Sequence, residues 1–395
     1  MHSDIATRTG RPQGIPRPAF RQFLKNLLGW STRRKLLVLS FDDYGVVRVA
    51  SREALARARQ WGLPVENRFD ELDALESRTD IEAMVDTLDC VRDKHNRPAV
   101  LSPFFIPMNL DFEAANESGL EDIRLEALDV TYQKLADHSP EAYGGAWDAW
   151  QEAVKSGLFV PALHGCQHWS SALFRHYLAH DRSQMERILS LRSYAWLPPS
   201  SFANVDPMQG CAFQQAQELD AIHQELERGV REFTRLLGAP PKYFNAPGGN
   251  ESCRTHEVLA RNGIRYIDVP RVMREHLGDG RVRRRFFHTG KRNRAGLTYI
   301  VRNVVFEPTF GDGGTAVDQA LKQIAAAFRM QRPAVVSSHR VNFGGEIDPN
   351  NRRLGLERLG ELLRSATRLW PDIEFISADE LGGCIAADSR RTSGE

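Results

Sequence analysis

Two adjacent carboxylates, Asp42 and Asp43, follow an apolar run in the segment LLVLSFDDYG at residues 36–45. A short apolar run that ends in a turn signal predicts a buried strand. Two like charges at the end of such a strand are unfavourable unless a cation compensates them. The alternative is a surface turn, since Asp and Gly are common turn formers.

A pair of histidines follows another apolar strand, in the segment PALHGCQHWS. His164 and His168 are four residues apart, and on one helical turn this spacing puts both imidazoles on one side. Two imidazoles and one carboxylate form a common open site for a divalent metal. We therefore expect Asp43, His164 and His168 to hold a metal ion that compensates the two carboxylates. A hydrogen-bonded polar cluster without metal is the alternative.

The elements that must position these residues alternate along the chain. Apolar runs predict strands at 36–41, 99–106, 158–163, 242–246, 264–268, 297–306, 333–338 and 373–377. Helical patterns occur between most of them, at 51–61, 79–94, 211–237, 252–262, 315–329 and 352–369. This alternation predicts an α/β fold of parallel βα units, either a (β/α) barrel, complete or distorted, or an open doubly wound sheet. Polar clusters after four of the strands then meet at the carboxyl edge, where such folds place active sites.

The domain organisation follows from the segments outside this alternation. Residues 1–30 are predicted to form an N-terminal tail and an amphipathic helix, and residues 31–386 the barrel. A long interruption at about 169–210 is predicted to lie over the carboxyl edge and to shape a cleft, because loops of this length are uncommon unless functional or disordered. Residues 387–395 are expected to be a disordered tail.

Composition excludes several classes of protein. The 395 residues contain 52 Lys and Arg against 51 Asp and Glu, so the net charge of +1 indicates no nucleic-acid binding. Five scattered Cys without a CxxC pair indicate reduced thiols and a cytoplasmic protein. No run approaches 18 apolar residues, and the first 20 residues lack the apolar segment of a secretory signal.

The segment FRQFLKNLLGW at 20–30 carries a helical stripe of Phe and Leu with Arg21 and Lys25 off the stripe. A basic amphipathic helix of this kind can make peripheral contact with a membrane surface. The favoured interpretation is that the stripe packs on its own domain.

The motifs resemble those of the polysaccharide deacetylases of the NodB-homology type, carbohydrate esterase family 4, in a divergent branch. The family motif T-F-D-D corresponds to SFDD at 40–43, H-x-x-x-H to HGCQH at 164–168, and L-x-H to SSH at 337–339. The resemblance spans roughly residues 36–385. It implies a distorted (β/α)7-type barrel with long inserted loops, and metal-dependent removal of an acetyl group, with zinc as the expected ion.

Within that resemblance, Asp42 is the expected general base and His339 the general acid, beside the ligands Asp43, His164 and His168. Further residues near the motifs are expected to contact the substrate: Tyr44, Trp169, Asn245, Pro247, Arg340 and Asn342.

The chain also departs from the family pattern. The motif R-x-P-[F/Y], whose Arg steers the base, corresponds to NAPG at 245–248 and has neither the Arg nor the aromatic residue. Arg340 is therefore our candidate for the cation that holds Asp42. Gly165 replaces a Ser or Thr, and Ser337 replaces the Leu that forms a wall for the acetyl methyl group.

The expected function is a metal-dependent hydrolase that removes an N- or O-acetyl group from an amino sugar or glycan precursor. The alternatives are a non-catalytic carbohydrate-binding or scaffold protein on the same barrel, and a hydrolase of a non-sugar amide. The basic run at 281–294 is expected to be a solvated loop, with attraction of an anionic substrate as the alternative.

Overall fold

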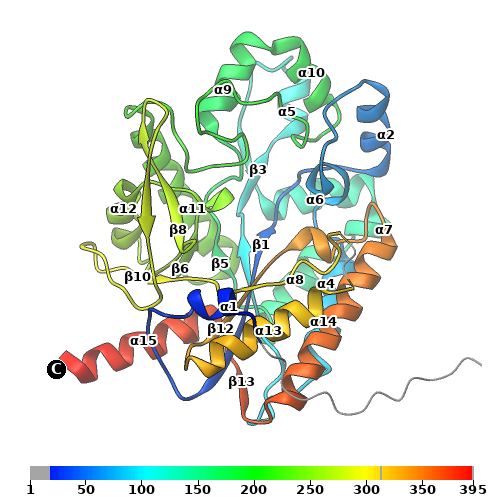
Figure 1. Cartoon of the computed structure of the whole chain (residues 1–395). Coiled ribbons are helices and arrows are strands. Elements are labelled where there is room, and N and C mark those ends of the chain that lie inside the picture. Colours follow the sequence, from blue (N-terminus) through cyan, green and yellow to red (C-terminus); the bar gives the residue numbers. More distant parts are fainter. Residues whose placement is uncertain (1–17, 312–313, 394–395) are drawn as a thin grey trace, which may run out of the picture.

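The computed structural model describes residues 18–311 and 314–393. A parallel sheet forms its centre, with the strand order β10-β7-β6-β5-β2-β1-β12-β11, and β13 pairs with the amino-terminal part of β1 (Figure 1). Its strands are β1 (Lys35–Tyr44), β2 (Leu101–Phe105), β5 (Ala162–Leu163), β6 (Tyr243–Asn245), β7 (Tyr266–Asp268), β10 (Thr298–Ile300), β11 (Val304–Val305), β12 (Ala334–His339) and β13 (Ile373–Phe375). All eight predicted strands correspond to strands of this sheet.

The two ends of the strand order belong to one stretch of chain. β10 pairs with β7 at one edge, and β11 pairs with β12 at the other. Only residues 301–303 separate β10 from β11, so a single interrupted strand joins the two edges. Counted in this way, the sheet is the distorted (β/α)7-type barrel that was predicted. The predicted strand at 297–306 is therefore broken in its middle.

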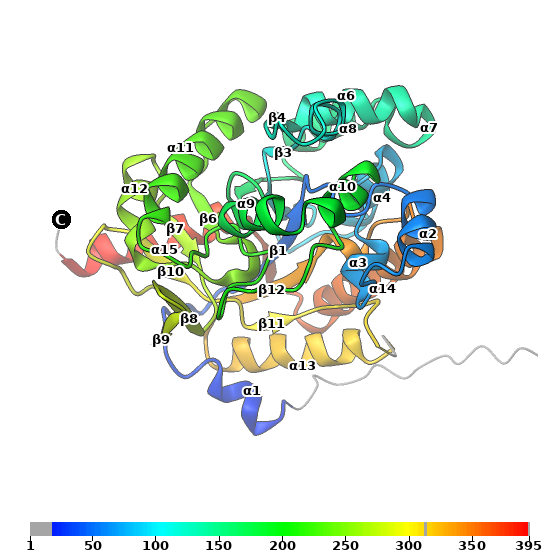
Figure 2. The same ribbon diagram turned by 90° about the horizontal axis from the view of Figure 1, so that it is seen from above.

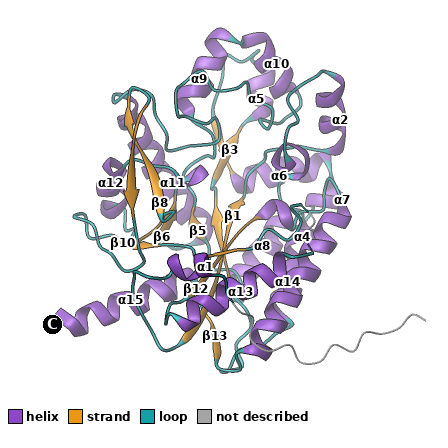
Figure 3. Ribbon diagram, viewed as in Figure 1, coloured by secondary structure: helices purple, strands orange, loops and turns teal. Residues whose placement is uncertain are grey.

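The helices surround this sheet (Figures 2 and 3). They are α1 (Phe20–Leu24), α2 (Arg52–Gln60), α3 (Arg68–Leu72), α4 (Arg78–Asp89), α5 (Phe112–Glu117), α6 (Leu128–His138), α7 (Pro140–Tyr143), α8 (Ala146–Lys155), α9 (Ser171–His180), α10 (Arg182–Ser190), α11 (Glu218–Leu237), α12 (His256–Arg261), α13 (Ala316–Arg329), α14 (Pro349–Leu369) and α15 (Ala378–Ser393). Three short 3-10 helices are η1 (Pro247–Gly249), η2 (Cys253–Thr255) and η3 (Arg340–Asn342). No helix in the described part of the chain is long and apolar enough to cross a bilayer.

Two antiparallel pairs lie outside the central sheet and were not predicted. They are β3 (Met108–Leu110) with β4 (Leu125–Ala127), and β8 (Val272–Gly278) with β9 (Arg281–Phe286). The basic run at 281–294, expected to be a loop, therefore begins as a strand. Most residues of β9 are exposed. Its sequence therefore lacks the alternation of apolar and polar residues that identifies a half-buried strand.

The two chain ends differ from expectation. The predicted disordered tail at 387–395 is wrong as far as Ser393, since α15 continues to that residue. At the other end, residues 1–17 of the predicted tail lie outside the described residues. The helix that follows, α1, ends at Leu24, and the segment 20–28 packs on its domain through the polar residues Gln22 and Asn26 rather than through most of its apolar stripe.

Candidate metal centre

A bulge in β1 lets Asp42 and Asp43 serve one site. Phe41 pairs with Pro103 and Tyr44 pairs with Phe105, so β1 holds one extra residue over this span. Asp43 accommodates this extra residue through a φ of +72°. This is a left-handed conformation, which Asp tolerates better than most residues. Neighbouring residues of a regular strand point to opposite faces, and the bulge removes that constraint.

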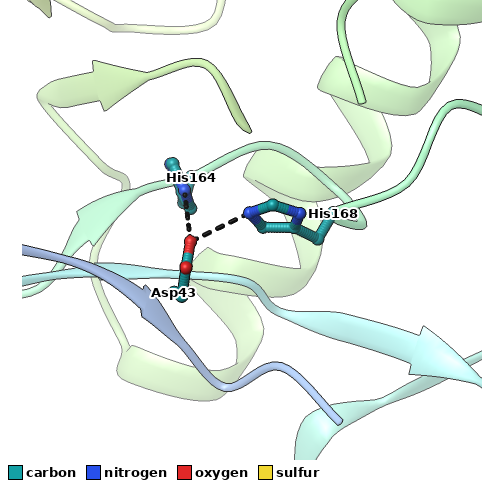
Figure 4. A group of neighbouring side chains, drawn as sticks. All are labelled: Asp43, His164 and His168. Carbon is teal, nitrogen blue, oxygen red and sulfur yellow. Dashed lines mark hydrogen bonds and ion pairs between the residues drawn. The ribbon is translucent and has the colours of Figure 1, made fainter. Parts of the chain in front are cut away.

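Asp43 lies between the two predicted histidine ligands (Figure 4). Its Oδ1 is 3.3 Å from His164 Nε2 and 2.9 Å from His168 Nε2, and the ligand atoms of the three residues lie within 4.8 Å of one another. All three side chains are buried. His164 follows β5 directly, but residues 164–170 form a loop and not the helical turn that the spacing suggested.

Gly165 makes this loop possible and explains one departure from the family motif. Its φ is +92°, and a Cβ placed there would lie 3.1 Å from Pro247 Cγ. A Ser or Thr at this position would be strained in backbone and crowded in side chain. The glycine therefore allows the histidine loop to pack closely against the segment after β6.

The protonation pattern of the site favours a cation. His164 Nδ1 lies 3.0 Å from the carbonyl oxygen of Asn245 and donates its hydrogen there, which leaves the lone pair of the neutral ring on Nε2. That lone pair faces the Asp43 carboxylate, an arrangement that is repulsive unless a proton or a metal ion lies between them.

The pKa values of the other two residues agree with this description. Burial lowers the pKa of His168 even though Asp43 is beside it, so a proton on that ring is disfavoured. Burial alone would raise the pKa of Asp43, but His168 and His164 outweigh it and hold the pKa well below its usual range. An anionic carboxylate beside imidazole nitrogens is the donor set that a divalent metal such as zinc requires.

Asp42 is held by an arginine that the sequence analysis did not select. Arg302 Nη1 lies 2.8 Å from both Asp42 oxygens, and its Nε lies 3.1 Å from Asp268 Oδ1. Arg302 lies in the three-residue break between β10 and β11. Burial raises the pKa of Asp268 to about 7 despite the nearby Arg302, so this carboxyl group is only partly ionised at neutral pH.

His339 lies on the other side of Asp42, because the two residues are aligned partners in the β1–β12 ladder. Its Nε2 is 3.8 Å from Asp42 Oδ2, and its Nδ1 donates to Glu307 Oε1 at 2.8 Å. Burial works against the charged imidazole, but the Glu307 hydrogen bond and the charges of Asp43 and Asp42 raise the pKa of His339 to about 9. At neutral pH His339 therefore carries a proton that it can donate.

These groups open into a cavity of about 570 Å³. Its floor includes both carboxylates, both imidazoles, Arg302 and His339. The long interruption after His168 contributes a wall through Ala195, Leu197, Pro198, Pro199, Asp206, Pro207 and Met208. Residues 195–208 of the predicted interruption thus line the cavity beside the carboxyl ends of the strands.

Six residues expected to contact substrate do not line this cavity: Tyr44, Trp169, Asn245, Pro247, Arg340 and Asn342. Tyr44 packs edge-on against Trp150 and Phe159, and Trp169 packs against Tyr194. All six side chains are buried in the packing around the site. Their positions correct the expectation, which placed them in the site because they are close to the motifs in sequence.

Asn245 and Asn342 instead support the residues of the site. Asn245 offers its carbonyl oxygen to His164, and Asn342 Nδ2 donates to Glu307 Oε2, the carboxylate that holds His339. Pro247 packs against the histidine loop at Gly165.

Arg340 does not hold Asp42, and that expectation is wrong. Its guanidinium donates to Asp73, to Glu76 and to the carbonyl oxygen of Val46, all within the protein interior. Arg302 takes the position expected for Arg340. One signal could have identified it, since Arg302 is the single charged residue in the apolar run LTYIVRNVVF.

Comparisons with known proteins reveal distant likenesses only. No family model matches the chain, and no curated protein matches it in sequence. Similar solved structures include a candidate polysaccharide deacetylase from Mycobacterium smegmatis (13% identity, 92% of this chain and 94% of that one, TM-score 0.45) and the Puue allantoinase (11%, 89% and 91%, 0.44). A family 4 acetyl xylan esterase from Clostridium thermocellum is also similar (11%, 88% and 90%, 0.32).

Proposed function

We propose that this chain is a metal-dependent hydrolase that removes an acyl group, an acetyl group in the first instance, from an amino sugar or glycan precursor. One observation carries the proposal. Asp43 Oδ1 lies 3.3 Å from His164 Nε2 and 2.9 Å from His168 Nε2, beside a second carboxylate and a protonated imidazole. A hydrogen-bonded cluster without metal would need a proton between Asp43 and His164, whereas one cation could bind the ligand atoms of all three residues at once.

The ligands would be Asp43, His164 and His168, and the proposed ion is zinc, for which two imidazoles and one carboxylate are a common ligand set. When bound, such an ion supplies a Lewis acid that polarises a carbonyl group and makes water more acidic. Side chains of the protein carry out the proton transfers. Asp42, oriented by Arg302, accepts a proton from the attacking water, and His339 donates its proton to the leaving amine or alcohol.

The cavity walls bear on the alternatives. Ser337 lines the cavity where the family motif has a leucine, so the pocket for the acyl group is more polar than an acetyl methyl requires. This observation keeps the hydrolysis of a non-sugar amide as a second candidate. The lost Arg and Leu positions of the motifs favour a non-catalytic protein, and Arg302 answers the first of them, since it supplies a guanidinium to Asp42.

The test uses purified protein loaded with zinc, a chromogenic acetyl ester, acetylated amino-sugar oligomers and a panel of simple amides. Asp42→Asn and His339→Gln should each keep the metal and lose rate by about 10²–10⁴-fold. Glu66→Gln, which changes another carboxyl group of the same cavity, is the matched control and should stay near the parent rate. Full activity in the Asp42 variant would refute the assigned base, and turnover of amides alone would favour the second candidate.

A further inference from the structure

The first helix of the described chain is oriented opposite to the usual pattern. Two of its apolar side chains, Phe20 and Leu24, are 78% and 43% exposed, while Phe23 is half-buried. Leu27 and Leu28, in the bend after the helix, are 50% and 63% exposed. The polar residues of the same segment face the protein, since Gln22 is 6% exposed and Asn26 3% exposed. A helix that served only the fold would bury its apolar stripe.

Specific hydrogen bonds hold the segment in this orientation. Asn26 Oδ1 accepts from Asn303 Nδ2 at 2.7 Å, and the Asn26 carbonyl oxygen accepts from Arg332 Nε at 3.0 Å. Asn26 Nδ2 donates to the carbonyl oxygen of Gln22 at 3.0 Å. Because buried polar groups must be paired, this network fixes which face of the segment points inward. The exposure of the Phe and Leu side chains therefore follows from this hydrogen-bond network.

A second pair of exposed apolar residues extends the same surface. Val272 and Phe286 are aligned partners at the open end of the β8–β9 hairpin and are 44% and 70% exposed. The neighbouring Arg271 donates to the carbonyl oxygen of Lys25, which ties the hairpin to the segment after α1. Six of the eight exposed large apolar side chains in the described part of the chain thus belong to these two segments.

These two segments carry mostly positive charge. Residues 20–28 contain Arg21 and Lys25 and no acid, and residues 271–294 contain nine Lys or Arg with two acids. The whole chain carries a net charge of only +1, so the remainder is acidic. A positive field around exposed Phe and Leu side chains complements a surface that is negatively charged and has an apolar interior.

We propose that the 20–28 segment and the open end of the β8–β9 hairpin form a docking surface for an anionic lipid membrane. Phe20, Leu24, Leu27 and Leu28 would enter the boundary between headgroups and acyl chains, while Arg21 and Lys25 contact lipid phosphates. A polyanion such as nucleic acid would use the charges but would leave the apolar side chains in water. This surface lies on the flank of the barrel beside α13, so docking leaves the carboxyl edge open (Figure 2).

The experiment measures sedimentation of the full chain with vesicles of phosphatidylcholine alone and with 30% phosphatidylserine. The parent should bind the mixed vesicles and release as salt rises, since the electrostatic part is screened. The triple variant Phe20→Ser, Leu24→Ser, Leu28→Ser should bind at least about tenfold more weakly. The double variant Arg21→Gln, Lys25→Gln should lose about fivefold or more, mainly on the mixed vesicles.

Val130→Ser is the matched control, because Val130 is also 44% exposed but lies on α6, at the opposite flank (Figure 2). It should bind like the parent, and all variants should keep the parent's thermal unfolding profile. Three results would overturn the proposal: no binding of the parent to mixed vesicles, equal binding by the triple variant, or self-association of the parent that the triple variant abolishes. The last result would assign the surface to a second copy of this chain.

Discussion

Two arginines of the barrel each bridge a pair of acids, but they face different surroundings. Arg340 is 1% exposed, and its donors reach Asp73, Glu76 and a backbone carbonyl in the interior. Arg302 joins Asp42 and Asp268 at the floor of the cavity. The first cluster has its charges enclosed by protein, whereas the second presents one carboxylate to the space where a substrate would lie.

In both clusters an arginine pairs with carboxylates, but one cluster stabilises the fold and the other orients a residue of the site. Glu76 accepts from the backbone N–H of Gly45 at 3.0 Å, so the Arg340 cluster anchors the chain directly after the two aspartates. Arg302 instead orients Asp42 itself. Removing Arg340 should therefore act mainly on stability, and removing Arg302 mainly on the rate.

The largest effect is expected for Arg340→Met. Asp73 and Glu76 would stay buried without their cation, and the loss of one partner from a buried ion pair costs about 3–5 kcal/mol. Urea unfolding measures this change. Arg353→Met is the matched control, because Arg353 pairs with Glu357 at the surface and should cost under about 0.5 kcal/mol. Similar losses in both variants would show that the Arg340 cluster contributes no more than a surface pair.

A smaller effect, on the rate, is expected for Arg302→Met. Without the guanidinium, Asp42 loses the contacts that aim it, and a misplaced catalytic group costs on the order of 100-fold in kcat. Arg302→Lys should recover part of the rate, since one ammonium can still contact Asp42. Zinc content measured alongside should stay at the parent level in both. Loss of metal together with the rate would instead mean that Arg302 supports the ligands.

The smallest of the three effects is a change in pH dependence for Glu307→Gln. His339 must be protonated to act as an acid, so the rate is lost as pH rises through its raised pKa. Removing the Glu307 charge lowers that pKa, and the alkaline limb of kcat should shift toward neutral pH, with a threefold to tenfold loss at about pH 8.5. A pH–rate profile records this shift. The limb of Glu66→Gln, which does not contact His339, should stay in place, and an unmoved limb in the Glu307 variant would remove His339 as the acid.

The parts of the site that the sequence could predict share a physical signal. Asp42, Asp43 and His164 each end or follow an apolar run, and the carboxyl ends of parallel strands meet at one edge. From that rule alone, residues far apart in the sequence could be predicted to lie close together. The same rule located the interruption after His168 above the cleft.

The parts that could not be predicted depend on contacts between distant segments. The bulge at Asp43 has no sequence signal. Arg302 is brought to Asp42 by the closure of the barrel between β10 and β11. The predicted helix over 20–30 ends at Leu24, before its apolar stripe is complete. The hydrogen bonds of Asn26 with Asn303 and Arg332 turn the polar side of this segment inward.

The central claim, a metal site at the strand ends, is tested most directly by a crystal of the full chain grown with one equivalent of zinc. Anomalous difference maps on the two sides of the zinc absorption edge identify the ion and its position. We predict a single strong peak within about 2.0–2.2 Å of His164 Nε2, His168 Nε2 and an Asp43 oxygen. No peak between these three residues, or an equal peak in crystals of Asp43→Asn, would contradict the account.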